Sequence, residues 1–146
     1  MKAQASIEFA VAFVIVALLF LFFSVIIYQR SVQINETKLN FAGQKISNSI
    51  ADAINSVFIS NSGTSECFSI PEKIHKDSYI VKFYKEEPTV FVYTDRQTWS
   101  SPIMTPYVNC TMKICSFSEN STIINVNSTL NIRVSHINDV IYLSEC

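Results

Sequence analysis

Four cysteines carry the most recognisable chemistry of this 146-residue chain: Cys67, Cys110, Cys115 and Cys146. A structural zinc site favours cysteine pairs separated by two residues, whereas the closest pair here has four residues between its members, so we expect no metal. An even number of cysteines favours two disulfides, for which three pairings are possible. We favour Cys110–Cys115, which would close a local loop, and Cys67–Cys146, which would tie the last strand to the start of a β-rich region.

The other residues with catalytic potential form no recognisable constellation. His75 and His136 are the two histidines, and neither has an evident carboxylate or nucleophile partner in the sequence. Gly43 and Gly63 are the two glycines, so a glycine-rich phosphate-binding loop is excluded. The formal net charge is -1, and the lysines of residues 73–85 alternate with acidic residues, which argues against nucleic-acid binding. We therefore expect neither an enzyme nor a cofactor.

Four Asn-x-Ser/Thr sequons are candidates for N-linked glycans, at Asn35, Asn109, Asn120 and Asn127. Because the chain is rich in Asn, Ser and Thr, some of these sequons are expected by chance alone. We rank Asn120 and Asn127 first, since they lie in a polar strand–turn region. Asn109 follows, and Asn35 is last because it lies close to an apolar segment.

That apolar segment runs from Ile7 to Tyr28, and Glu8 is its one ionisable residue apart from the terminal Tyr28. A helix rises about 1.5 Å per residue, so the run would span roughly 33 Å, enough to cross a bilayer core. A carboxylate inside such a run costs free energy unless it is paired, and therefore indicates a function. The run is longer than the core of a secretory signal and is followed by no small-x-small cleavage site, so we expect it to be retained.

The residues around Glu8 form a motif. Lys2 and Ala3 precede Gln4, Ser6, Glu8 and Phe9, which together read Gln-x-Ser-x-Glu-Phe directly against the apolar run. This arrangement resembles the class III signal peptides of archaeal type IV pilin-like proteins. The resemblance covers about the first 25 residues. It departs from the usual pattern at Ala3, where Gly is commoner, and in the shortness of the leader.

The resemblance implies that a membrane-embedded prepilin peptidase cuts between Ala3 and Gln4 on the cytoplasmic side. Glu8 would become the fifth residue of the mature chain, where the family's glutamate pairs with the amino terminus of a neighbouring subunit. Such a pair would fix the register between helices, because an unpaired charge among apolar helices is strongly disfavoured. Cyclisation of an amino-terminal Gln4 would remove the positive partner and leave Glu8 another role, such as guiding entry into the filament.

One long helix and a β-rich region must position these residues. Apolar residues at three- and four-residue spacing continue to Phe58, so we expect a helix over residues 4–60, apolar all round at first and amphipathic later. Residues 61–64 would end it. β-branched and aromatic runs predict strands over 79–84, 89–94, 107–114, 122–126, 130–134 and 140–143, with turns at 85–88 and 138–139. We expect Trp99 in the core, although residues 95–102 could also form an exposed loop.

These elements indicate an α+β fold of the type IV pilin kind, in which a C-terminal antiparallel β-sheet packs on the amphipathic half of the helix. The expected segments are a leader (residues 1–3), a transmembrane or filament-core helix (4–28), its amphipathic continuation (29–60) and an external β-rich domain (61–146). Lys2 favours a cytoplasmic amino terminus, whereas Arg30 and Lys38 oppose it. The cysteines and sequons favour an external C-terminal domain, so we expect an N-in, C-out orientation.

We therefore expect a structural protein, a major or minor subunit of an archaeal type IV pilus-like surface filament. Its partners would be the membrane before assembly, the prepilin peptidase, other pilin subunits, and host or abiotic surfaces in adhesion. Two alternatives stay open. One is a pseudopilin that primes a Tad-like or secretion system. The other is a monomeric, membrane-anchored extracellular binding module in which Glu8 is incidental.

Overall fold

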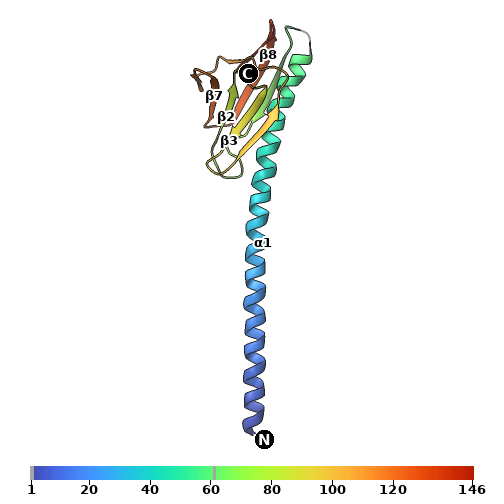
Figure 1. Cartoon of the computed structure of the whole chain (residues 1–146), viewed down its shortest axis with the longest axis vertical. Helices are drawn as coiled ribbons and strands as arrows, with labels where there is room; N and C mark the ends of the chain where they lie inside the picture. The colour runs from blue at the N-terminus through green and yellow to red at the C-terminus, as the bar shows by residue number, and fades with distance from the viewer. Residues whose placement is uncertain (1, 61) are drawn as a thin grey trace. The chain divides into compact units, whose positions relative to one another are not determined.

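The computed structural model describes the backbone of residues 2–60 and 62–146 and the side chains of residues 7–60 and 62–146. In this part of the chain, helix α1 (Lys2–Ile59) is followed by nine strands (Figure 1). Ala3, Gln4 and Ser6 have helical backbone, but their side chains, on which the processing prediction depends, lie outside the described residues. The chain divides into two compact units, Met1–Lys38 and Leu39–Cys146.

The first unit is helical, and every side chain from residue 7 to residue 38 is exposed. No glycine or proline interrupts this stretch, and helical hydrogen bonds satisfy its backbone internally, as an apolar environment requires. The Ser24 hydroxyl also donates within the helix, to the Phe20 carbonyl at 2.8 Å. The described side chains of this unit therefore form no core of their own.

The second unit combines the last part of α1 with two sheets. The four-stranded sheet has the order β1-β8-β9-β5, and the five-stranded sheet has the order β4-β3-β2-β7-β6. The strands are β1 (Ser65–Ile70), β2 (Tyr79–Tyr84), β3 (Thr89–Tyr93), β4 (Thr98–Pro102), β5 (Val108–Cys110), β6 (Cys115–Ser118), β7 (Ser121–Val126), β8 (Leu130–Ile137) and β9 (Val140–Glu145). All neighbours are antiparallel except β5 and β9. The expected α+β layout is confirmed, but the single antiparallel sheet is two sheets, and one contains a parallel pair.

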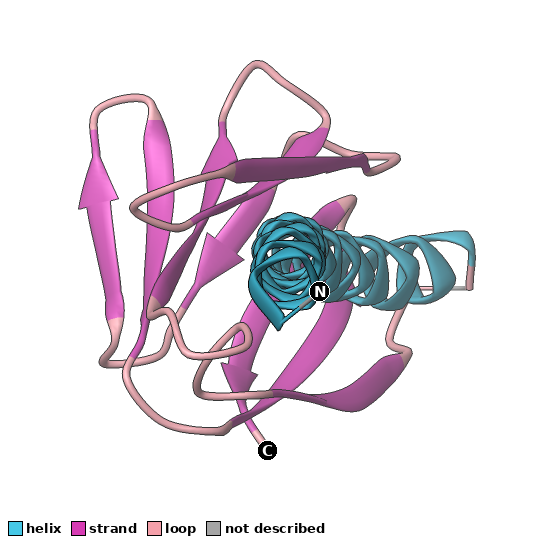
Figure 2. Cartoon of the chain, turned by 90° about the horizontal axis from the view of Figure 1, so that it is seen from below, coloured by secondary structure: helices cyan, strands magenta, loops and turns pink. Residues whose placement is uncertain are grey.

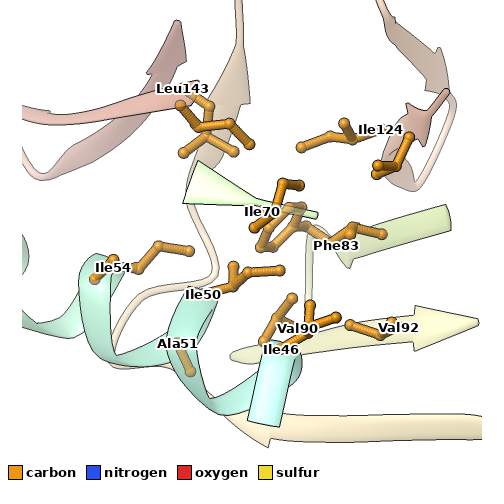
Figure 3. Close-up of a cluster of buried hydrophobic side chains, with 14 of the residues drawn as sticks. Ile46, Ile50, Ala51, Ile54, Ile70, Phe83, Val90, Val92, Ile124 and Leu143 are labelled. Atoms are coloured by element: carbon orange, nitrogen blue, oxygen red, sulfur yellow. The ribbon is translucent and has the colours of Figure 1, made fainter. Parts of the chain in front are cut away.

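The core of this unit lies between the later part of α1 and both sheets (Figures 2 and 3). Ile46, Ile50 and Ile54 recur at four-residue spacing, so they share one face of α1, and all three are buried. The strands contribute every second residue, as Val90 and Val92 do on β3. This alternation explains why the amphipathic part of α1 and the alternating strands fold into one unit.

Most strands and turns agree with the sequence predictions. β2 has the expected bounds, and the β2–β3 hairpin pairs Phe83 with Val90. Asn138 and Asp139 form the turn between β8 and β9 with φ values of 50° and 62°, a left-handed geometry that both residue types tolerate. Gly63 has a φ of 98° just after α1 ends, while Asn61 lies outside the described residues.

Three strands were not predicted: β1, β4 and β6. Residues 98–102 form β4 and pair with β3, so the exposed loop considered over 95–102 is wrong for this part. Residues 107–114 contain a strand only at 108–110. Trp99 is buried, as expected, and its ring lies directly against Gly43 of α1, where a Cβ would overlap it. Gly43 thus allows the close approach of α1 and β4.

Candidate functional site

The first candidate is the apolar helix surface, which we define as the large apolar side chains of residues 7–28. Their exposed fractions range from 37% at Ile26 to 74% at Phe9. Soluble monomers rarely expose contiguous apolar patches larger than a few hundred Å², so a surface of this kind normally has a lipid or protein partner. By length and composition, the helix could cross a membrane.

Glu8 is exposed within this apolar helix surface, directly before Phe9. Residues 9–28 contain no cation, so none can be reached along the neighbouring turns on the C-terminal side. In an apolar environment, a partner for this carboxylate has to come from residues before Ile7 or from another molecule. The arrangement is therefore suited to a charge pair that forms where the helix meets a second component.

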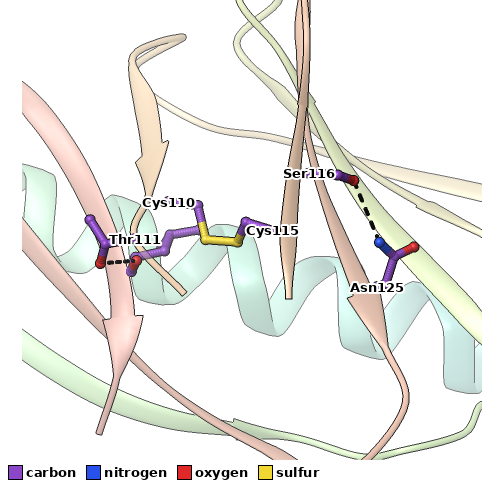
Figure 4. The surroundings of a disulfide bond; sticks show 6 residues. Cys110, Thr111, Cys115, Ser116 and Asn125 are labelled. Carbon is purple, nitrogen blue, oxygen red and sulfur yellow. Dashed lines mark hydrogen bonds between the residues drawn. A yellow bond between two sulfur atoms is a disulfide. The ribbon is translucent and has the colours of Figure 1, made fainter. Parts of the chain in front are cut away.

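Both disulfides join the pairs that the sequence analysis favours. Cys67 of β1 bonds to Cys146 after β9, at a sequence separation of 79, and the Cα atoms are 6.3 Å apart. Cys110 at the end of β5 bonds to Cys115 at the start of β6 (Figure 4). Since β5 and β6 are edge strands of different sheets, this second bond links the two sheets. All four cysteines are therefore bonded within the second unit.

The four sequon asparagines are all exposed. Asn35 lies on α1 in the first unit and Asn109 on β5. Asn120 lies in the β6–β7 turn, where its carbonyl accepts a hydrogen bond from the Lys85 backbone N–H at 3.1 Å. Asn127 lies in the loop between β7 and β8. Each side chain thus has room for a glycan, and exposure alone ranks none above the others.

An aromatic cluster on the outer face of the five-stranded sheet was not predicted. It consists of Tyr84, Phe91 and Tyr93, which are half-buried. The ring centroids of Phe91 lie 5.4 Å from Tyr84 and 6.0 Å from Tyr93. The Lys82 ammonium lies 5.1 Å from the Tyr93 ring centroid, in a cation–π contact. Sequence reasoning assigned aromatic strand residues to the core, but their odd–even position along β2 and β3 directs these three outward.

The aromatic cluster perturbs one of its own hydroxyls. Burial raises the pKa of Tyr93 to about 12, and a hydrogen bond and charge interaction with Tyr84 act in the same direction, as does the charge of Glu87. The Tyr84 and Tyr93 hydroxyl oxygens are 3.4 Å apart. The Tyr93 hydroxyl therefore remains protonated at neutral pH and can donate a hydrogen bond to a ligand.

A second surface feature is a groove of about 590 Å³, which we call the β1 groove. It is lined by Phe41, Gln44, Lys45, Asn48, Ser49, Asp52, Ala53 and Ser56 of α1 and by Glu66 and Phe68 of β1. Apart from Ala53, which is buried at the edge of the core, the α1 residues of the lining are exposed. The groove combines two phenylalanines with three charged side chains. The sequence analysis did not predict this groove, because it did not predict β1, which forms one of its sides.

The two histidines have different surroundings. His136 is buried beside Phe58, and its Nδ1 lies 3.4 Å from the Ser60 carbonyl oxygen, while Nε2 lies 3.8 Å from an Asp139 carboxylate oxygen. His75 is exposed. Across residues 7–60 and 62–146, no cluster of three or more His, Cys, Asp or Glu side chains could hold a metal ion.

Comparison with known proteins identifies no relative. No protein-family model matches the chain, and neither a curated protein nor a solved structure matches it. The features that bear on function are the apolar helix surface with Glu8, the disulfide-bonded second unit, the aromatic cluster and the β1 groove.

Proposed function

We propose that this chain is a pilin-like subunit, major or minor, of an archaeal type IV pilus-like surface filament. In this proposal a prepilin peptidase cuts between Ala3 and Gln4, and residues 4–28 anchor the subunit in the membrane, N-in and C-out, until it assembles. The observation that carries the proposal is the apolar helix surface, which is exposed throughout and contains Glu8 near its start.

The exposed apolar helix surface supports a role in two environments. In the bilayer, lipid covers side chains such as Phe9, Phe13 and Phe20. After extraction, the same side chains need another apolar partner, and the helices of other subunits supply one. One helix face meeting a different face on the next copy gives a heterologous contact that does not close, and repetition of that contact builds a filament.

Glu8 gives this assembly a charge-dependent step. Cleavage before Gln4 exposes an α-amino group with an ordinary pKa near 8, which is largely protonated at neutral pH. An ammonium from one copy and the Glu8 carboxylate from the next can neutralise each other among apolar helices. A misplaced register would leave the carboxylate unpaired and cost several kcal/mol.

The second unit is suited to an external location. It contains two disulfides, which persist in oxidising environments outside the cytoplasm. Its three sequon asparagines, Asn109, Asn120 and Asn127, are exposed and free to carry glycans. These properties support the C-out orientation and, with it, a filament on the cell surface.

The proposal is tested by the mass of the mature protein and by one substitution. We expect a mature chain that begins at Gln4, in either its open or its cyclised form. Glu8→Ala should leave membrane insertion intact but reduce filaments recovered by shearing at least tenfold, because the register pair is lost. Glu86→Ala is the matched control, since Glu86 is also an exposed glutamate but lies between β2 and β3, outside the apolar helix surface and the β1 groove. A mature chain that still begins at Met1, or normal filaments from Glu8→Ala, would contradict the proposal.

A second candidate function is a membrane-anchored extracellular binding module. The aromatic cluster favours it, because half-exposed rings beside a lysine can stack on a ligand and donate hydrogen bonds to it. This function predicts that Glu8→Ala has no effect on the protein and that Phe91→Ala weakens surface binding by monomers. A pseudopilin predicts a different result. The protein would be scarce in sheared filaments, although secretion by the same cells would depend on its gene.

A further inference from the structure

We propose that the β1 groove binds residues 27–38 of a second copy of this chain. This inference rests on the proposed function and specifies which surfaces of two copies meet. The occupant would be the part of α1 that begins at the C-terminal end of the apolar helix surface. It presents two isoleucines and two basic residues on one face.

The β1 groove offers both apolar and acidic contacts. Phe41 is 75% exposed, and Phe68 on β1 is partly exposed beside it. Asp52 and Glu66 give the groove two carboxylates against the single ammonium of Lys45, so its lining carries a net charge of -1. None of these charged groups forms an ion pair with another described residue. A partner with apolar and basic side chains would therefore complement this surface.

Residues 27–38 have that complementary chemistry. Ile27, Arg30, Ile34 and Lys38 follow one another at intervals of three, four and four residues, so they lie along one face of α1. All four are exposed, Ile27 by 69% and Ile34 by 52%. The same face carries the two basic residues that oppose the N-in, C-out orientation. A role in pairing with carboxylates of another copy would account for basic residues at this place.

The spacings of the two surfaces agree. Subunits that leave one membrane in the same direction are parallel, and in the assembled filament a displacement of 14 residues brings Ile27 of one copy opposite Phe41 of the next and Lys38 opposite Asp52. It also brings Arg30 opposite Gln44, whose side-chain oxygen can accept a hydrogen bond. Fourteen residues are close to four helical turns, so both sets stay on the contacting face, and the axial shift is about 21 Å. One displacement therefore satisfies the apolar and the charged contacts together.

Cross-linking tests this contact directly. Two copies are co-expressed in intact cells, one with Lys38→Cys and the other with Asp52→Cys, while the four native cysteines remain bonded to one another. In the matched control, Glu86→Cys replaces Asp52→Cys, because Glu86 is an exposed acidic residue between β2 and β3 that does not line the groove. Mild oxidation should yield at least ten times more disulfide-linked heterodimer from the 38–52 pair. Equal yields from the two pairs would overturn the inference.

Charge reversal gives an independent readout. Asp52→Lys places two ammonium groups together and should reduce the recovered filaments about tenfold, while Lys38→Asp combined with Asp52→Lys should restore them to within about threefold of wild type. An unimpaired Asp52→Lys or an unrestored double variant would overturn the inference. Thermal unfolding of each variant separates a folding defect from lost contact.

The two proposals fail in different ways. Filaments that form without a 38–52 cross-link would contradict the groove contact and leave the pilin-like function intact. A 38–52 cross-link in intact cells that never yield filaments would contradict the filament function and leave the contact between copies intact. The cross-link is measured in intact cells as well as in sheared material, so each proposal has its own result.

Discussion

The two units of this chain use apolar side chains in opposite ways. In the first unit, Ile15 is 52% exposed, like every other apolar residue of the described helix before Leu39. In the second unit, Ile54 on the same helix is fully buried. The two stretches share a residue type and a secondary structure but differ in pattern, since one is apolar all round and the other is amphipathic. Pattern therefore indicates the environment of a helix more reliably than apolar content does.

The difference also concerns what stabilises each unit. The described side chains of the first unit make no core, so its helix depends on backbone hydrogen bonds and on whatever surrounds it. The second unit has a shared core of helix and strand residues and two disulfides. Changes to the second unit should alter the free energy of unfolding, whereas equivalent changes to the first should alter only insertion or assembly. Trp99, the single tryptophan, is buried in the second unit, so its fluorescence follows that unit alone.

The largest expected effect is the loss of the long-range disulfide. Replacing Cys67 and Cys146 by Ser should lower the free energy of unfolding of the second unit by about 4.5 kcal/mol, because the bond closes a loop of 79 residues in the unfolded chain. Replacing Cys110 and Cys115 by Ser should cost only about 2 kcal/mol, since that loop spans 5 residues. Urea unfolding in detergent, followed by Trp99 fluorescence, measures both. Equal losses would show that chain entropy does not govern these bonds.

The next effect compares the same substitution in the two units. Ile54→Ala should lower the free energy of unfolding of the second unit by about 3–4 kcal/mol, because the cavity it leaves lies in a packed core. Ile15→Ala removes the same atoms from an exposed position and should change this free energy by less than about 0.5 kcal/mol. A comparable loss in both variants would mean that Ile15 also contributes to the folding of the second unit.

The sequence predicted the parts of the fold that local pattern determines. β2 and β3 are rich in β-branched and aromatic residues, and the type of turn at Asn138 and Asp139 follows from its residues. β4 was missed because Ser101, one of its two inward residues, is polar, which leaves Trp99 as a single apolar signal. Ser101 is buried where the hydroxyl of Ser47, 54 residues away, lies 2.8 Å from its own hydroxyl. A strand with one apolar inward residue and one long-range hydrogen bond shows no alternating apolar pattern in the sequence.

The features of the candidate site also differ in whether local sequence pattern reveals them. The apolar helix surface and Glu8 could be recognised from the sequence, since neighbouring residues make up the whole pattern. The β1 groove could not, because Glu66 and Phe68 approach the exposed face of α1 only through strand pairing of β1 with β8. The outward direction of the aromatic cluster likewise depends on which face of the sheet the core covers.

A smaller effect concerns the close contact between α1 and β4. Gly43→Ala adds a methyl group that overlaps the Trp99 ring, and overpacking of this kind costs about 1–3 kcal/mol. Alanine is the better helix former by about 1 kcal/mol, so the net loss should be about 1 kcal/mol. Ser56→Ala, at an exposed helix position, is the control and should be neutral or slightly stabilising. A more stable Gly43→Ala variant would show that the Trp99 ring can move aside at little cost.

The smallest effect is a dependence on alkaline pH, and it should again appear only in the second unit. Burial raises the pKa of Tyr79, whose hydroxyl donates to the Pro71 carbonyl at 2.5 Å. Above pH 10 the unfolded chain releases this proton while the folded chain keeps it, so the unfolded state binds fewer protons and stability falls as pH rises. The loss should be at most about 1 kcal/mol between pH 10 and pH 11. Tyr79→Phe should be less stable than wild type at pH 8, because the hydrogen bond is missing, yet lose less stability from pH 10 to pH 11. Parallel pH profiles for the two proteins would mean that Tyr79 ionises equally well in the folded state. The Tyr79 hydroxyl would then be accessible to solvent in the folded state, unlike the side chain of Ile54 in the same core.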